Sequence, residues 1–142
     1  MCGFVGFFGG EVANNRELAD ATLVAMGKGI SARGPDSSGA WCASDDAIGM
    51  SHRRLSILDL SPAGHQPMLS KSSRYVVAYN GEIYNHLDLR AQLEGEVGPI
   101  VWRGSSDTET LLEAIEFWGI EETLQKLKGM FAFGIWDKKK HI

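Results

Sequence analysis

The residue with the clearest capacity for chemistry is Cys2, which directly follows Met1. The thiolate is the reactive form of cysteine, and an ordinary thiol needs a base close by because it titrates near ~8.5. Removal of Met1 would leave a free α-amine on the same residue, and such an amine has a pKa of about 7.7–8. We therefore predict that Cys2 is a nucleophile that carries its own base. The competing interpretation, from position alone, is a buried thiol in a strand.

A second chemical feature is the pair Asn80-Gly81, which follows the apolar, β-prone run 75–79. A side-chain amide and a neighbouring backbone N–H can together stabilise an oxyanion, by about 2.7–4 kcal/mol per donor. The alternative is a hairpin turn, because Asn-Gly is the strongest short hairpin signal.

Several elements must position these residues. The apolar segment 2–8 predicts a buried strand that other backbone approaches closely at its glycines. Asn14 or Asn15 is expected to cap a helix to about residue 30, with a stripe at 19, 23, 26 and 30. The turn residues of 33–39 predict a loop, followed by strands at 39–43 and 47–52. The segment 53–71 is expected to be irregular.

The second half of the chain alternates between short strands and helices. We expect a strand at 75–79, a helix at 84–94 with Tyr84, Leu87 and Ala91 on one side, and a short strand near 99–103. Ser106 and Glu109 form a capping-box pattern before a further helix. A brief helix near 121–127 and a buried strand at 131–136 follow. This order indicates an α+β sandwich with helices outside packed sheets.

Composition limits the function further. The chain has 142 residues and a net charge of −4, which indicates one domain without a basic surface for nucleic acid or a membrane. No apolar run approaches a membrane span, and the start has no secretion signal, so we expect a cytoplasmic protein. The four histidines lack metal spacing, and Cys42 is interpreted as a buried hydrophobe.

Six segments of the sequence resemble one family, in its order. They are Cys-Gly-Phe-Val-Gly at 2–6, Arg-Gly-Pro-Asp-Ser-Ser-Gly at 33–39, the segment 52–60 with its continuation at 64–68, Tyr-Asn-Gly-Glu-Ile-Tyr-Asn at 79–85, Ser-Asp-Thr-Glu at 106–109, and Gly-Met-Phe-Ala-Phe at 129–133. Together they resemble the N-terminal glutaminase domain of glutamine-hydrolysing asparagine synthetases, the class II glutamine amidotransferases. The resemblance implies a four-layer αββα sandwich of the N-terminal-nucleophile hydrolase type. We expect residues 1–142 to be an incomplete glutaminase domain that lacks its return strand and its synthetase domain.

The resemblance also implies roles for individual residues. Cys2 would be the nucleophile and Asn80 with Gly81 the oxyanion hole, while a second set would bind the substrate: Arg54, Leu55, Ile57, Leu58, Glu82 and Asp107. Arg54 would hold the α-carboxylate, for which a guanidinium fork is suited. Glu82 and Asp107 would hold the α-ammonium. Without the family context, Arg54 is a surface arginine, and Asp107 is a carboxylate favoured at a helix start.

The implied reaction is hydrolysis of the glutamine side-chain amide through a cysteinyl thioester. Ammonia would pass to a C-terminal synthetase domain of the same polypeptide. We expect no cofactor and no metal in this chain, since it lacks a Ser-Gly-Gly-x-Asp-Ser phosphate loop; ATP and Mg²⁺ would belong to the synthetase domain.

Three alternatives stay open at the level of sequence. The chain could bind glutamine as a regulatory module without turnover. It could be the glutaminase domain of a relative that amidates another acceptor, or of another class II branch, such as glucosamine-6-phosphate synthase or amidophosphoribosyltransferase. The sequence also allows a homodimer formed through an unsatisfied sheet edge.

Overall fold

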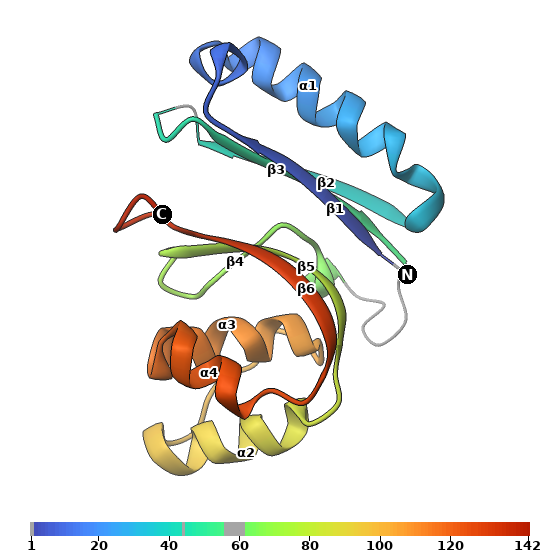
Figure 1. The fold of residues 1–142 in the computed structure, drawn as a ribbon. Helices are drawn as coiled ribbons and strands as arrows, with labels where there is room; N and C mark the ends of the chain where they lie inside the picture. Colours follow the sequence, from blue (N-terminus) through green and yellow to red (C-terminus); the bar gives the residue numbers. More distant parts are fainter. Residues whose placement is uncertain (1, 44, 56–61) are drawn as a thin grey trace.

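Two antiparallel sheets lie face to face, and helices cover the outer face of each (Figure 1). The computed structural model describes residues 2–43, 45–55 and 62–142. Within these ranges, α1 covers one sheet, and α2, α3 and α4 cover the other. The four layers confirm the αββα sandwich expected from the sequence.

Each sheet has three strands in the described ranges. The first has the order β1-β3-β2 and consists of β1 (Gly3–Phe8), β2 (Ser37–Ala43) and β3 (Ile48–Arg54). The second has the order β4-β5-β6 and consists of β4 (Met68–Leu69), β5 (Tyr75–Ile83) and β6 (Gly129–Asp137). The helices are α1 (Arg16–Gly29), α2 (His86–Val97), α3 (Asp107–Trp118) and α4 (Ile120–Lys126). Short 3₁₀ turns occupy Glu11–Asn14, Ser31–Arg33 and Pro62–Gly64. None of the helices in these ranges is long and apolar enough to cross a membrane.

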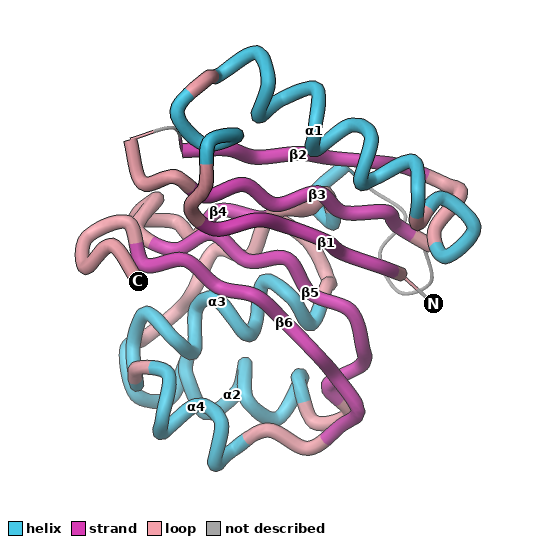
Figure 2. The backbone as a smooth tube through the Cα atoms, turned by 45° about the horizontal axis from the view of Figure 1, so that its top comes forward, coloured by secondary structure: helices cyan, strands magenta, loops and turns pink. Residues whose placement is uncertain are grey.

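Helix α1 forms as its sequence predicts. The side chain of Asn15 accepts a hydrogen bond from the backbone N–H of Leu18 at 3.1 Å, so Asn15 is the cap rather than Asn14. Helix α1 runs along the outer face of the first sheet (Figure 2). Ala19 and Leu23, one turn apart, are fully buried. The first half of the predicted stripe thus forms the packed face of α1. The third buried residue is Gly27, whereas Met26 is half-buried and Ile30 follows the end of the helix.

The largest core cluster lies between the second sheet and its helices. Val77 and Tyr79 of β5 contribute to it, together with Leu111 and Ile115 of α3, and Phe131 of β6 packs against it. The alternation along β6 places Phe131, Phe133 and Ile135 on this face, while Trp136 points into the space between the sheets.

A smaller cluster joins the two sheets. It contains Met50 of β3, Ala78 of β5 and Trp136 of β6, with Phe4 of β1 packed against it. The buried His52 adds a polar link, because its Nε2–H donates to the carbonyl oxygen of Tyr79 at 2.9 Å. The sheets are therefore held together by packing and by a hydrogen bond from one sheet to the other.

His52 should make stability depend on acid. Burial lowers the pKa of His52 to about 4, against the opposing effect of its bond to Tyr79. Between about pH 6.5 and 4 the unfolded chain binds this proton and the folded chain does not, so stability falls as the pH is lowered. We expect the free energy of unfolding to lose roughly 1.4 kcal/mol per pH unit in this window from this residue. Urea titrations from pH 4 to 7 measure the slope. His52→Gln keeps a hydrogen-bond donor but has no titrating ring, so its free energy of unfolding should depend less steeply on pH. A slope equal to that of the parent would exclude His52 as the cause.

Two predictions of secondary structure are wrong. Tyr84 precedes α2, and Leu87 is 67% exposed, whereas Leu89 and Leu93 are buried. The segment 99–103 is not a strand, and Val101 is 82% exposed. Pro99 has no N–H to offer a ladder, and the amides of residues 103 and 104 donate to the Glu109 carboxylate instead of to a neighbouring strand.

Candidate active site

A cavity of about 270 Å³ collects every site residue that the sequence predicts within the described ranges. These residues are Cys2, Arg54, Leu55, Asn80, Gly81, Glu82 and Asp107. They come from the start of β1, the end of β3, the end of β5 and the start of α3. Ile57 and Leu58 lie outside the described residues.

Strand alternation explains how the first sheet contributes to the cavity. Side chains of a strand point alternately to its two faces, and Phe4 of β1 and Met50 of β3 face the second sheet. Cys2 is two residues from Phe4, and Arg54 is four from Met50. Since Gly3 pairs with Arg53, the same register places Cys2 opposite Arg54, so both side chains belong to the inner face.

The second sheet contributes by the same rule. Ala78 of β5 packs between the sheets, and Asn80 and Glu82 follow it at even spacing. The hairpin-turn alternative for Asn80-Gly81 is wrong, because both residues lie within β5 and pair with Ala132 and Phe131 of β6. The Asn80 amide therefore faces the sheet that carries Cys2.

Gly81 occupies a position that only glycine fits. Its φ is 153°, and a Cβ at this site would lie 2.4 Å from the Met130 carbonyl oxygen and from the Phe131 Cα. The backbone of β6 thus approaches Gly81 too closely for a side chain. The glycine of the Asn80-Gly81 pair is therefore also required by the packing of β5 against β6.

The thiol of Cys2 contacts the backbone of Leu55. The Leu55 N–H donates to Sγ at 3.3 Å, and Sγ lies 3.5 Å from the Leu55 carbonyl oxygen. An N–H aimed at the sulfur suits a thiolate, whereas the carbonyl can accept from the neutral thiol. This half-buried cysteine is in neither a disulfide nor an apolar core, so the buried-thiol interpretation does not describe it.

The loop after α1 holds the first residues of the chain in place. Arg33 Nε donates to the carbonyl oxygen of Cys2 at 3.1 Å, and Arg53 Nε donates to the carbonyl oxygen of Gly34 at 3.1 Å. The Asp36 N–H donates to the carbonyl oxygen of Arg54 at 3.0 Å. These bonds fix the backbone of the 33–36 loop beside Cys2.

Asp107 is buried at the first position of α3 and faces β5. Its Oδ2 accepts hydrogen bonds from the Tyr79 hydroxyl at 2.7 Å and from the Ile83 N–H at 2.9 Å. Burial raises the pKa of Tyr79, and the bond to the Asp107 carboxylate raises it further, so the phenol stays a donor. The preceding residue, Ser106, caps the helix by accepting from the Glu109 N–H at 3.3 Å.

Arg54 and Glu82 bring opposite charges to the cavity wall. The Arg54 guanidinium lies against Gly64, where an added Cβ would be 2.1 Å from Nη2. Glu82 is exposed, and β-sheet register places it opposite Met130. A cation and two carboxylates, those of Glu82 and Asp107, suit the two charged groups of a free amino acid.

The cavity also has lining residues that the sequence did not single out as binding residues. They include Gln66, Tyr79, Tyr84, Thr108 and Met130. Gln66 is buried, accepts from the Tyr79 N–H at 2.6 Å and donates to Thr108 Oγ1 at 3.4 Å. All five lie within the segments that resemble the family, which was a usable signal. Met130 reaches the cavity because β6 pairs with β5 and places it opposite Glu82. In the described part of the chain, no three His, Cys, Asp or Glu side chains are placed to hold a metal ion.

Comparison with known protein families assigns the chain to one of them. The model of the family described as "Glutamine amidotransferase domain" matches residues 1–142. The chain therefore belongs to the glutamine amidotransferase domain family.

Individual relatives narrow the comparison. The chain is 40% identical over its whole length to glutamine-hydrolyzing asparagine synthetase 1 of Bacillus subtilis. Over 96% of its length it is 41% identical to a putative glutamine-hydrolyzing asparagine synthetase of Mycobacterium bovis. It is also 36% identical, over 78% of its length, to amidase chry2 of Gibberella zeae, of which it covers 16%. The chain spans 22% of the length of each of the two synthetases.

Proposed function

We propose that this domain hydrolyses the side-chain amide of glutamine to glutamate and ammonia through a thioester on Cys2. The observation that carries the proposal is the single cavity in which Cys2, Asn80-Gly81, Arg54, Glu82 and Asp107 meet. Its volume of about 270 Å³ lies just below the range typical of drug-sized ligands and suits an amino acid. Glutamine is also the substrate that the relatives' names specify.

In the proposed reaction the Cys2 thiolate attacks the carbonyl carbon of the glutamine side-chain amide. The α-amine of Cys2, exposed by removal of Met1, takes the thiol proton and passes it to the leaving nitrogen. The carbonyl oxygen becomes an oxyanion, which the Asn80 side-chain amide and the Gly81 N–H stabilise. Collapse breaks the carbon–nitrogen bond, releases ammonia and leaves a glutamyl thioester. Water then attacks the thioester and releases glutamate and the free thiol.

The charged residues would hold the reactant in place. Arg54 binds the α-carboxylate, for which a planar guanidinium is suited. Glu82 and Asp107 bind the α-ammonium, and Leu55 lines the cavity, with Ile57 and Leu58 proposed to extend its wall. This arrangement leaves the side-chain amide to face Cys2.

The ammonia would be used by a synthetase domain elsewhere on the same polypeptide. The proposal rests on the names and lengths of the relatives, which this chain covers to 22%. ATP and Mg²⁺ would act there, so we propose that this domain needs neither.

Intact mass and ammonia release test the function together. We expect the purified protein to lack Met1 and to convert glutamine to glutamate and ammonia in equal amounts, without ATP. Fully active protein that retains Met1 would exclude the α-amine as the base. Protein that binds glutamine without releasing ammonia would instead identify a regulatory module.

A further inference from the structure

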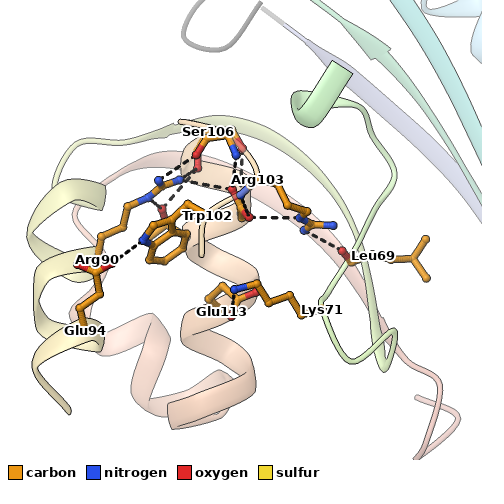
Figure 3. A network of polar contacts seen from close by, with 11 residues as sticks. Leu69, Lys71, Arg90, Glu94, Trp102, Arg103, Ser106 and Glu113 are labelled. Carbon is orange, nitrogen blue, oxygen red and sulfur yellow. Dashed lines mark hydrogen bonds and ion pairs between the residues drawn. The ribbon is translucent and has the colours of Figure 1, made fainter. Parts of the chain in front are cut away.

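Arg90 of α2 reaches over to the backbone segment that leads into α3 (Figure 3). Its Nη1 donates to the Gly104 carbonyl oxygen at 3.0 Å, its Nη2 to the Ser106 carbonyl oxygen at 2.9 Å, and its Nε to Thr110 Oγ1 at 2.8 Å. The guanidinium carbon lies 4.0 Å from the centre of the Trp102 ring. With its side chain only 12% exposed, Arg90 connects three points around the first turn of α3.

Glu109 fixes the same segment from within α3. Its carboxylate is 2% exposed and accepts from the backbone N–H groups of Arg103 at 2.8 Å and Gly104 at 3.0 Å. Arg90 Nη2 lies 3.7 Å from this carboxylate, and Arg103 Nε lies 3.2 Å from it. The carboxylate and the guanidinium together satisfy backbone donors and acceptors of a segment that forms no strand.

The opposite side of this segment faces the cavity. Ser106, Asp107 and Thr108 all line it, and Asp107 Oδ2 is bonded to the Tyr79 hydroxyl and the Ile83 N–H. The carbonyl group of Ser106 belongs to the peptide bond that links it to Asp107. The bond from Arg90 to that oxygen therefore acts on the peptide group next to Asp107, whose carboxylate is proposed to bind the substrate.

We infer that Arg90 is a positioning residue for substrate selection: by holding the Gly104–Ser106 backbone, it places the Asp107 carboxylate to bind the α-ammonium of glutamine. This inference rests on the proposed function. The position needs the guanidinium, because a fork can serve separated acceptors and stack on an indole at once. A lysine ammonium is a single point charge and cannot reproduce this geometry.

The test compares Arg90→Lys with the parent on two substrates: L-glutamine and its analogue without the α-amino group. We expect KM for L-glutamine to rise about tenfold, as for the loss of one charge-assisted hydrogen bond, with kcat within about twofold. The analogue has no ammonium for Asp107 to bind, so its kcat/KM should stay near the parent value. Asp107→Asn should give the same pattern, and adding Arg90→Lys to it should cost little more.

Arg74→Lys is the matched control. Arg74 is also partly buried and makes paired bonds to a carboxylate, with Nε and Nη2 at 3.0 Å and 2.6 Å from the Asp137 oxygens. Neither Arg74 nor Arg90 lines the cavity. We expect this variant to lose stability while both substrates keep the parent KM.

Thr110→Val provides a second variant if Arg90→Lys folds poorly. It removes the acceptor of the Arg90 Nε–H and also the longer bond, at 3.4 Å, from the Thr110 hydroxyl to the Ser106 carbonyl oxygen. Because the other two Arg90 bonds remain, a smaller rise of KM for L-glutamine alone is expected. An equal fall of kcat/KM on both substrates, or an unchanged KM for L-glutamine, would overturn the positioning role. Hydrogen exchange needs no turnover: faster exchange of the Gly104 amide in Arg90→Lys supports the role, and unchanged exchange overturns it. A parent protein inactive on both substrates would instead overturn the proposed function.

Discussion

Replacing Cys2 with alanine is expected to abolish ammonia release while leaving glutamine binding intact. Alanine removes the sulfur that accepts from the Leu55 N–H at the cavity wall but leaves the proposed anchors Arg54, Glu82 and Asp107 unchanged. Without the nucleophile no thioester can form, and residual hydrolysis would depend on the oxyanion donors and on binding alone. The fall should therefore exceed that of any other single substitution proposed above.

Three measurements define this result. Ammonia release should drop to background, mass spectrometry after rapid quenching should detect no glutamyl adduct, and calorimetry should give a Kd for glutamine close to the parent value. Cys42→Ala is the matched control, because Cys42 is the other half-buried free thiol and lies on β2 away from the cavity. Release of ammonia by Cys2→Ala at the parent rate would falsify the assignment of the nucleophile.

Replacing Asn80 with alanine is expected to lower kcat by about 10²–10³-fold with little change in KM. The proposed bond from the Asn80 amide forms to an oxyanion that exists only along the reaction path, so its loss affects the transition state more than the bound substrate. Asn80→Asp should be at least as severe. It removes both N–H donors of the side-chain amide, and it places a negative charge beside the oxyanion that develops during the reaction. Steady-state ammonia release gives both parameters.

Asn85→Ala separates this chemical effect from a structural one. The Asn85 side chain donates to the Lys126 carbonyl oxygen and accepts from the Lys128 N–H, each at 2.9 Å, and it does not line the cavity. Its removal should lower stability and leave kcat unchanged. A large rise of KM in Asn80→Ala, with kcat preserved, would show that Asn80 binds substrate instead of stabilising the oxyanion.

Local signals in the sequence predicted those elements whose cause is itself local. Asn15 and Ser106 cap α1 and α3 because a short polar side chain can satisfy the first free N–H groups. The predicted capping box is only half formed, however. Glu109 bonds to the amides of Arg103 and Gly104, because the incoming segment turns its backbone toward the carboxylate.

Where two patterns fitted one segment, packing made the choice. In α2, one set of apolar residues includes Leu87 and Ala91, and another consists of Leu89 and Leu93. Periodicity permits both faces, but the second is the one that becomes buried. Helix position relative to the sheet, rather than helix propensity, decides which leucines form the core.

The sequence by itself determined the types of group available for chemistry: a cysteine after Met1, an amide beside a glycine, one guanidinium and two carboxylates. The order of strands and helices also indicated an α+β sandwich with helices outside packed sheets, and the family resemblance implied its four αββα layers. Only the tertiary structure decided that these groups share one cavity, that Met130 lies opposite Glu82, and that Arg90 supports the segment before Asp107. The reason is that strand register and sheet-to-sheet packing depend on contacts between residues far apart in the chain, which no local pattern encodes.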